Sequence, residues 1–377
     1  MGRPWAALYR TDCTRSSFDA GSIRKFLGGS STTSALLVAS ESSNVPSPWL
    51  VGSALVGLPL ALWVYKCLMM IAFQRKIIYM GGIPLGSRSE ELRINDRDIV
   101  VNEISIQNGH IQLSGIIVSR PGVVENARPP LVIMYLQGNA GNPLHRIPKF
   151  RLLAGKLKGN FEREVQVIAV APRSYWKSTN ASPSEAGFLS DYTAVLEWIS
   201  TTYPHSPVIL YGHSIGGSIA VKLLGSLPAG GMSPASRVRG LVLENAFTSM
   251  PAMVRAVYSS KWLPYYYLDV PPISRTSALR NVILSPPSIL IIASESDELV
   301  PPDMNREIFD AASKMHRGLP KPLGAGPKRV VISGALHDDG FTKRQWRDAI
   351  RAYITDVAAV DSYRQFLQTN IISVEQE

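Results

Sequence analysis

Short apolar runs at regular spacing are the feature that most restricts the fold of this 377-residue chain. Runs of this length, rich in Val and Ile and bounded by Gly, Pro or polar residues, are typical of strands buried on both faces of a parallel sheet. They are LVIMYL (131–136), VQVIAV (165–170), PVILYG (207–212), GLVLEN (240–245), SILIIAS (288–294) and RVVISG (329–334). Helical stretches are predicted between them at 144–157, 184–201, 215–227, 303–315 and 342–357. The pattern therefore predicts an α/β domain with a mostly parallel sheet flanked by helices.

A hairpin is predicted ahead of these strands. VVNEISI (100–106) and IQLSGIIV (111–118) alternate apolar and polar residues, and a short turn containing Asn108 and Gly109 separates them. Alternation on both sides of such a turn is a hairpin signal, so we expect the sheet to begin with two antiparallel strands.

An apolar segment precedes the domain at residues 49–73, WLVGSALVGLPLALWVYKCLMMIAF. As a helix this segment is long enough to cross the roughly 30 Å hydrocarbon core of a bilayer. Lys66 can extend its ammonium group to the interface, and a proline such as Pro59 is tolerated in membrane helices. The segment therefore predicts one transmembrane helix, with a buried core helix as the alternative.

The remaining parts of the chain are bounded by these elements. We expect a disordered leader or tail at 1–48, the transmembrane helix at 49–73, a juxtamembrane linker at 74–96, the catalytic domain at 97–360 with a cap or lid insert at 246–287, and a C-terminal tail at 361–377. The Ser, Thr and Gly content of the leader, with few acids, has some features of a transit peptide but lacks a basic amphipathic helix.

Basic residues suggest how the chain is oriented. Lys66, Arg75 and Lys76 flank the C-terminal end of the apolar segment, and residues 30–48 contain no Lys or Arg. The positive-inside rule then places the catalytic domain in the cytosol, although basic residues within 1–25 argue for the reverse. We expect a single-pass protein of an endomembrane of ER type, with a mitochondrial membrane as the alternative.

Composition restricts the partners. The formal net charge is +10, but no compact basic tract with interleaved aromatic residues is present, so we expect no nucleic-acid partner. The two cysteines, Cys13 and Cys67, lie outside the catalytic region, so we expect no disulfide there and no metal site. Cys67 is either an S-acylation site or an unmodified residue. The sequence does not specify an oligomeric state.

Gly212-His213-Ser214-Ile215-Gly216 is the sharpest local motif. This G-x-S-x-G follows a predicted strand and begins a predicted helix, which is the context of a nucleophile elbow. Gly212 and Gly216 are expected because larger side chains would collide with the strand or the helix. The motif predicts Ser214 as a nucleophile, with an idle serine in a Gly-rich turn as the alternative.

A serine hydroxyl needs a general base, and the base needs an acid that orients it. His337 follows the last predicted strand at the edge where catalytic groups gather, and we choose it over His316. Asp297 is the predicted acid because it follows the strand SILIIAS. Rival carboxylates are Glu295, Glu298 and Glu244.

Acyl transfer also needs N–H donors for the oxyanion of the tetrahedral intermediate. The backbone N–H of Ile215 should be one donor, and Asn139, in the loop Gln137–Asn142, the other. An ordinary Gly-rich turn is the alternative. Because the chain itself supplies nucleophile, base and donors, no cofactor is expected.

The insert at 246–287 is rich in aromatic and Met side chains. Such residues either line an acyl pocket or pack a cap helix onto the domain. We name Phe247 and Trp262 as candidate pocket residues, together with Tyr175 and Trp176. Apolar walls beside a membrane anchor favour a hydrophobic acyl substrate.

Several segments together resemble the membrane-anchored α/β-hydrolase-domain proteins of the bud-emergence type. They are LQGNAGN (136–142), YGHSIGGSIA (211–220), LVLENAFTSM (241–250), SESDELVPP (294–302) and ALHDD (335–339). The resemblance implies the α/β-hydrolase fold, a Ser214–Asp297–His337 triad, an N-terminal membrane anchor, and hydrolysis of acyl ester or thioester bonds, with lipid-like substrates plausible.

The chain departs from the pattern of that family in two segments. Gln137 stands where the family usually has His, and Ser174 and Trp176 stand where the 171–178 turn usually has Gly. These changes put the substrate shape, and full activity, in doubt. A catalytically weak scaffold in cell polarity or signalling, and a transferase or haloperoxidase-like enzyme on the same fold, are the alternatives.

Overall fold

The computed structural model describes residues 47–122, 128–157, 163–227, 233–257, 287–318 and 326–374. The expected leader, most of the expected lid and the candidate pocket residue Trp262 lie outside these residues. The expectations made for them therefore stay predictions.

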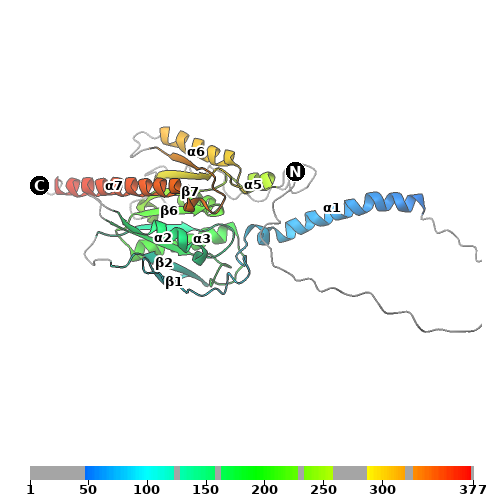
Figure 1. Cartoon of the computed structure of the whole chain (residues 1–377), viewed down its shortest axis with the longest axis horizontal. Helices are drawn as coiled ribbons and strands as arrows, with labels where there is room; N and C mark the ends of the chain where they lie inside the picture. The colour runs from blue at the N-terminus through cyan, green and yellow to red at the C-terminus, as the bar shows by residue number, and fades with distance from the viewer. Residues whose placement is uncertain are drawn as a thin grey trace, which may run out of the picture. The chain divides into compact units, whose positions relative to one another are not determined.

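One nine-stranded sheet forms the centre of the domain (Figure 1). Its strands are β1 (Val100–Asn108), β2 (Ile111–Ser119), β3 (Leu131–Leu136), β4 (Gly155–Leu157), β5 (Arg163–Val170), β6 (Val208–His213), β7 (Val238–Glu244), β8 (Ser288–Ser294) and β9 (Lys328–Ile332). The spatial order is β1-β2-β5-β3-β6-β7-β8-β9, with β4 paired to β5. The β1–β2, β2–β5 and β4–β5 pairs are antiparallel and the rest are parallel. The predicted hairpin and the mostly parallel sheet are confirmed.

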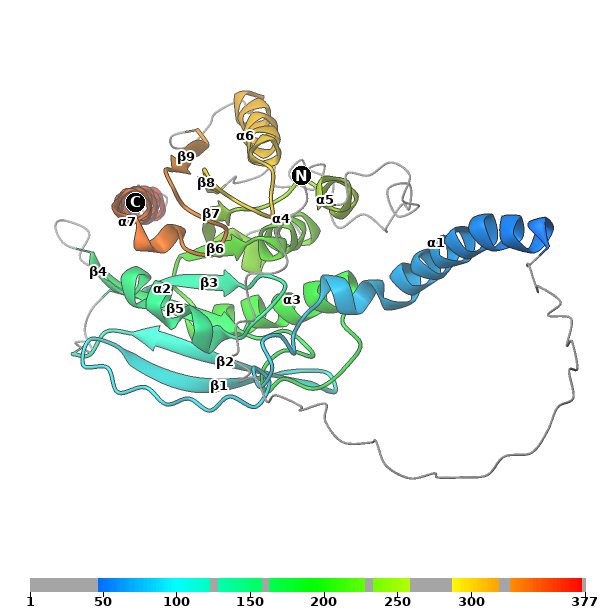
Figure 2. The same cartoon turned by 45° about the vertical axis from the view of Figure 1, so that its right-hand side comes forward.

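Helices cover both faces of this sheet. Figure 2 shows α2 (Ile147–Leu153) and α7 (Arg344–Val374) on one face, and α3 (Glu185–Thr202), α4 (Ile215–Ser226) and α6 (Pro302–Arg317) on the other. Every residue of β3 and β6 is buried, as their uniformly apolar sequences predict for central strands covered on both sides. The short helix α5 (Met250–Val257) and the 3₁₀ turns η1 (Pro143–Arg146), η2 (Pro234–Arg237) and η5 (Gly340–Thr342) complete the described elements.

The helix predicted at 144–157 is shorter than expected. It divides into η1 and α2 and ends at Leu153, because Ala154 is extended and Gly155–Leu157 pair with β5 as β4. The spacing of apolar residues in this stretch did not distinguish the helix from the short strand that follows it.

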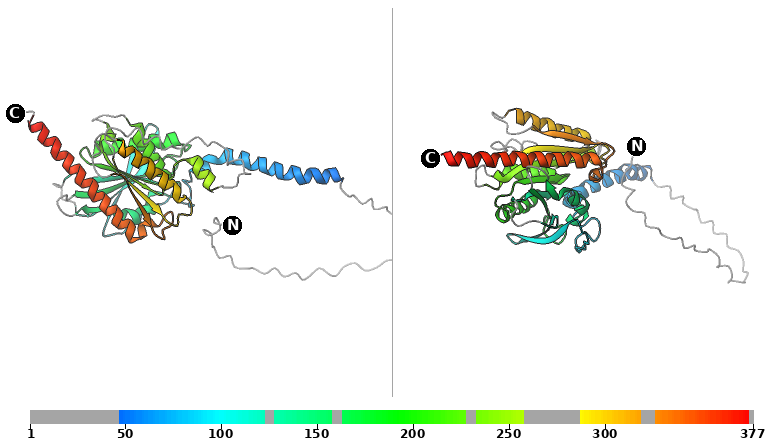
Figure 3. Two further views of the ribbon diagram at one scale, coloured as in Figure 1. Left: turned by 90° about the horizontal axis from the view of Figure 1, so that it is seen from above. Right: turned by 60° about the vertical axis from the view of Figure 1, so that its left-hand side comes forward.

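The last helix is longer than expected. It continues past residue 357 to Val374, through the stretch interpreted as a tail, and its C-terminal part extends beyond the sheet (Figure 3). Asp361 is only 2% exposed, and it pairs there with Arg163 on β5 at 3.0 Å and with Arg239 on β7 at 2.9 Å. A buried carboxylate held by two guanidinium groups fixes this part of the helix against the sheet.

The apolar segment near the N-terminus forms one continuous helix, α1 (Pro48–Ile78), longer than the predicted 49–73. None of its residues is buried, and Trp49 and Leu55 are 88% and 71% exposed. A core helix would bury such side chains. Within the described part of the chain, α1 is the one helix long and apolar enough to cross a membrane.

Candidate active site

Ser214 occupies a strained turn between β6 and α4. Its φ of 55° and ψ of −122° lie outside the conformations that L-residues normally adopt. A Cβ on Gly212 would lie 2.4 Å from Gly217 Cα, and one on Gly216 would lie 2.2 Å from the Leu136 carbonyl oxygen. Side chains at these two positions are therefore excluded, as the elbow interpretation requires.

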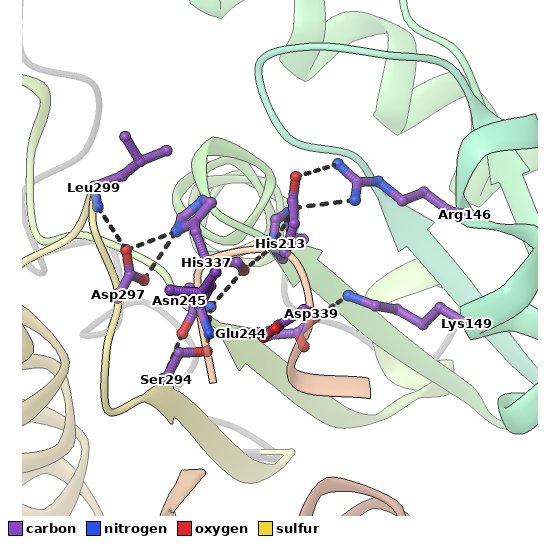
Figure 4. A network of polar contacts seen from close by, with 12 residues as sticks. Arg146, Lys149, His213, Glu244, Asn245, Ser294, Asp297, Leu299, His337 and Asp339 are labelled. Carbon is purple, nitrogen blue, oxygen red and sulfur yellow. Dashed lines mark hydrogen bonds and ion pairs between the residues drawn. The ribbon is translucent and has the colours of Figure 1, made fainter. Parts of the chain in front are cut away.

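Asp297 and His337 come together at the carboxyl ends of the parallel strands, as Figure 4 shows. Nδ1 of His337 lies 2.9 Å and 3.0 Å from the two carboxylate oxygens of Asp297. The Asp297 Oδ1 atom also accepts the N–H groups of Leu299 and Val300, each at 2.8 Å. The carboxylate is thereby fixed with His337 as its partner, so that Nε2 is the imidazole nitrogen left for proton transfer.

The predicted hydrogen bond between Ser214 and His337 is not formed. Among the hydrogen bonds of the described residues, none joins Ser214 Oγ to His337. His213, adjacent to Ser214, packs its ring 5.0 Å from the His337 ring, so the segments that carry the candidate nucleophile and the candidate base are in contact. Such bonds are commonly long before a substrate binds.

The rival residues have other partners. Glu298 accepts the backbone N–H of His337, Glu295 accepts the N–H of Gly334, and Glu244 pairs with Lys149. His316 lies in the last turn of α6. Of the candidate acids, only Asp297 is hydrogen-bonded to an imidazole nitrogen of His337 within the described residues.

The backbone of His337 is held from three sides. Its N–H donates to Glu298 at 3.0 Å, and its carbonyl accepts Asn245 Nδ2 at 2.7 Å and His213 Nε2 at 3.2 Å. Asn245, fully buried with a φ of 49°, also donates to Ser294 Oγ and accepts the Ser294 N–H. These contacts fix the loop that carries the base.

A buried ion pair lies beside this loop (Figure 4). Lys149 Nζ is 2.5 Å from Glu244 Oε2, and both side chains are at most 2% exposed. Tyr211 and Trp346 donate to the same carboxylate, each at 2.9 Å. Burial is the largest single influence and raises the pKa of Glu244, but the Lys149 charge and the hydrogen bonds from Lys149 and Tyr211 together lower it by more. The net pKa is therefore lowered and the carboxylate stays ionised.

His213 is a neutral, buried imidazole. Burial, aided by the positive charge of Lys149, lowers its pKa from the ordinary 6.5 to about 3. A neutral ring that donates from Nε2 to the His337 carbonyl leaves Nδ1 without a proton. That Nδ1 atom is buried with no hydrogen-bond partner among the described residues.

The predicted oxyanion donors lie on two loops close to Ser214. A Cβ on Gly138 would lie 3.7 Å from Ser214 Cβ, which places the loop Gln137–Asn142 beside the nucleophile. Ile215 begins α4, where backbone N–H groups have no partner inside the helix. In the described chain, no turn or loop hydrogen bond between backbone groups uses the N–H of Asn139 or Ile215.

The unusual turn at 171–178 keeps a glycine-like backbone without glycine. Ser174 and Trp176 have φ values of 67° and 40°, which favour Gly. Tyr175 and Trp176 are fully buried, and their polar atoms donate to the backbone carbonyls of Asn139 and Glu90, each at 2.8 Å. Tyr175 therefore contacts the loop Gln137–Asn142, and the added bulk of Trp176 contacts the segment after α1. Substrate contact by Tyr175 and Trp176 stays a prediction.

The other departure and the remaining pocket candidate also lie near the site. Gln137, at the usual His position, is 4% exposed, and its side-chain amide group has no hydrogen-bond partner among the described residues. Phe247 is 5% exposed, and its carbonyl accepts Ser218 Oγ on α4 at 3.1 Å. Pocket lining by Phe247 stays a prediction.

Sequence reasoning missed the residues that support the base. Asn245 and His213 contact the carbonyl of His337, and Lys149 pairs with Glu244, the residue before Asn245. Asn245 directly follows a buried strand, at the edge where functional groups gather, and that position was the available signal. Lys149 lies in a predicted helix and gave no signal.

Comparisons with known proteins place the chain in a family. Residues 177–275 match the family model described as serine aminopeptidase, S33. The protein bem46 of Schizosaccharomyces pombe is 28% identical over 282 residues, covering 71% of this chain and 87% of that protein. The uncharacterized protein MT2364 of Mycobacterium tuberculosis is 30% identical over 296 residues, covering 76% and 89%.

Two further comparisons are more restricted. The lysophosphatidylserine lipase ABHD12 of Danio rerio is 28% identical over 195 residues, covering 48% of this chain and 47% of that protein, so the match spans about half of the lipase. A solved fungal esterase of Rhizomucor miehei superposes with a TM-score of 0.51 at 15% identity, covering 77% of this chain and 92% of that one, which supports the fold.

The chain therefore belongs to the α/β-hydrolase superfamily, in the bud-emergence type of hydrolase-domain proteins, and by class it is a serine hydrolase.

The buried imidazole generates a prediction about pH. Native His213 stays unprotonated down to about pH 3, whereas an unfolded histidine binds a proton near pH 6.5. Its contribution to stability is therefore complete above pH 6.5 and declines as the pH falls towards 3, by up to about 1.4 kcal/mol per pH unit. His213→Gln should remove this component and keep an N–H donor.

The measurement is urea unfolding of the detergent-solubilised chain at several pH values between 6.5 and 4. The free energy of unfolding of wild type should fall more steeply with decreasing pH than that of His213→Gln. Equal slopes would contradict a neutral, buried His213.

Proposed function

We propose that this chain is a membrane-anchored serine hydrolase that cleaves acyl ester or thioester bonds through Ser214, Asp297 and His337. The observation that carries the proposal is the Asp297–His337 contact of 2.9 Å and 3.0 Å beside a serine with a φ of 55° at a strand-to-helix turn. This arrangement supports a Ser–His–Asp triad, in which the three residues occur in the chain order expected for this fold.

The proposed reaction has two steps. Ser214 Oγ attacks the acyl carbonyl while its proton passes to Nε2 of His337, and the oxyanion is held by the N–H groups of Ile215 and Asn139. The tetrahedral intermediate expels an alcohol or thiol that takes the proton from His337, leaving an acyl-serine. Water then attacks this ester and gives a proton to Nε2 of His337. The second tetrahedral intermediate collapses with loss of the bond to Ser214 Oγ, which takes that proton back from His337 as the carboxylic acid leaves. Asp297 orients the imidazole and stabilises its charged form.

A hydrophobic acyl substrate fits two features of the chain. The apolar helix α1 places the domain at a lipid surface if it spans the bilayer. Leu299, two residues after the proposed acid, and Leu336, directly before the proposed base, are 37% and 48% exposed. The similarity to a lysophosphatidylserine lipase supports a lipid-like or acylated substrate as part of the proposal.

Labelling with a fluorophosphonate probe tests the nucleophile. Wild type should be labelled and Ser214→Ala should not, whereas Ser226→Ala, at the other end of α4, should be labelled like wild type. With an ester substrate, Ser214→Ala should lower kcat by about 10⁶-fold and Asp297→Asn by about 10⁴-fold. A folded wild type that is not labelled would favour the scaffold, and transfer of the acyl group to an added alcohol in preference to water would favour the transferase.

Hydrolysis of p-nitrophenyl esters of increasing acyl length tests the substrate class. We expect kcat/KM to rise with chain length, because each buried CH₂ contributes about 0.8 kcal/mol. Faster cleavage of short, charged esters than of long-chain esters would overturn the proposed lipid-like substrate without affecting the triad.

Protease protection of intact vesicles tests the proposed placement in the membrane. Arg75 and Lys76 lie in the last turn of α1, so the catalytic domain is expected on the cytosolic side of an ER-type membrane. External protease should therefore digest the domain of sealed microsomes. A domain protected until detergent is added would place it in the lumen.

A further inference from the structure

The segment that follows α1 is hydrogen-bonded to the oxyanion loop. Met80 donates its N–H to the Asn139 carbonyl at 2.7 Å, and Gly141 donates its N–H to the Ile83 carbonyl at 2.7 Å. Met80 and Ala140 form a parallel β-bridge. The two strips of backbone are thus connected in both directions, although about sixty residues separate them in the sequence.

The side chains of the oxyanion loop continue this connection. Asn142 donates to the Ser87 carbonyl at 2.8 Å and to the Glu90 carboxylate at 2.6 Å. The same carboxylate is 2.8 Å from His145 Nε2, just beyond the loop. Ser87 is only 2% exposed, and its hydroxyl donates to the Gly81 carbonyl. The segment therefore has internal hydrogen bonds as well as hydrogen bonds to the loop.

The unusual turn at 171–178 holds both partners from a third side. The Tyr175 hydroxyl donates to the Asn139 carbonyl at 2.8 Å, so this carbonyl accepts two hydrogen bonds. Trp176 Nε1 donates to the Glu90 carbonyl. A Cβ on Gly81 would lie 2.4 Å from the Ser174 carbonyl oxygen and 2.9 Å from Tyr175 Cδ2, which shows how closely the segment and the turn are packed.

We infer that the juxtamembrane segment Tyr79–Glu90 and the residue Tyr175 position the oxyanion hole. Two hydrogen bonds on the Asn139 carbonyl fix the peptide group that follows Asn139, and the Gly141–Ile83 bond fixes the next part of the loop. The N–H of Asn139 is thereby held in one direction beside Ser214. Because α1 ends at Ile78, the residues that leave the membrane helix are themselves the support of the active site. This inference rests on the proposed role of Asn139.

Strain in the turn is consistent with this role. Ser174 and Trp176 hold positive φ values that Gly would adopt without strain, and such strain persists only where the surroundings enforce it. Trp176 gains a buried position and a hydrogen bond to the Glu90 carbonyl, and Tyr175 between them reaches Asn139. Two glycines would leave the backbone of the turn unchanged but would remove the indole that connects it to the juxtamembrane segment.

Adjacent glycines provide a matched pair of variants in the full-length chain. In Gly81→Ala the new methyl group meets the turn, whereas in Gly82→Ala it meets nothing within 4 Å. With an ester substrate, Gly81→Ala should lower kcat about 10- to 100-fold and leave KM within about twofold. The reason is that a displaced oxyanion donor weakens stabilisation of the transition state more than binding of the substrate. Gly82→Ala should behave like wild type.

Two tyrosines provide a second pair, which separates positioning from stability. Tyr175→Phe removes one hydrogen bond to Asn139 and should lower kcat about 2- to 10-fold at unchanged KM. Tyr353→Phe removes an equally buried hydroxyl that contacts the backbone of Leu241 and Ser288, so it should lower the melting temperature without changing kcat. Equal effects of the two changes on kcat and KM would overturn the inference.

Amide hydrogen exchange tests the connection independently of activity. Peptides covering residues 138–142 should exchange faster in Gly81→Ala than in Gly82→Ala, because the Gly141 N–H loses its acceptor on Ile83. Faster exchange in a chain that cleaves no ester would refute the proposed function but keep the connection. Unchanged exchange, or unchanged kcat in an active chain, would refute the inference and leave the proposed function standing.

Discussion

The contact between the nucleophile turn and the neighbouring strand is the constraint on which the other features of the site depend. At Gly216 the first turn of α4 approaches the end of β3 so closely that a Cβ would lie 2.2 Å from the Leu136 carbonyl oxygen. This approach holds Ser214 in its strained conformation, and it also determines where the loop after β3 begins. The proposed nucleophile and the proposed oxyanion loop are therefore placed relative to each other by backbone packing, independently of the side chains of Asp297 and His337.

Polar contacts then place the base relative to that frame. The carbonyl of His337 accepts hydrogen bonds from Asn245, after β7, and from His213, at the end of β6. Beside them the Lys149–Glu244 pair is buried, an arrangement that contributes little net stability compared with apolar packing but is costly to disrupt. The functional role of such a network is to specify geometry, because each buried polar group accepts only a few arrangements of its partners.

The connection between α1 and the active site gives a reason why a hydrolase of this kind keeps its unusual turn. Tyr175 and Trp176 are not free to vary as exposed residues are, because their polar atoms support the backbone of Asn139 and Glu90. The sequence suggested only that extra bulk lay near the substrate. The structure shows that Trp176 is buried and bonded to the chain emerging from α1, while the neighbouring Tyr175 contacts Asn139, so the consequence that we infer for the enzyme concerns the support of the loop.

The amino-acid sequence by itself determined the α/β fold, the strand order along the chain, the apolar helix and the G-x-S-x-G turn. These features depend on local periodicity and on glycines whose steric reason is local. It also ranked Asp297 above its rivals, through the family resemblance. The tertiary structure decided what depends on contacts between distant segments. Asn245 holds the backbone of His337, Lys149 pairs with Glu244, α7 continues to Val374 past the buried Asp361, and residues after α1 are hydrogen-bonded to the loop Gln137–Asn142. A linear pattern does not encode these pairings, because each partner has an ordinary local sequence and acquires its role only when the sheet brings both together.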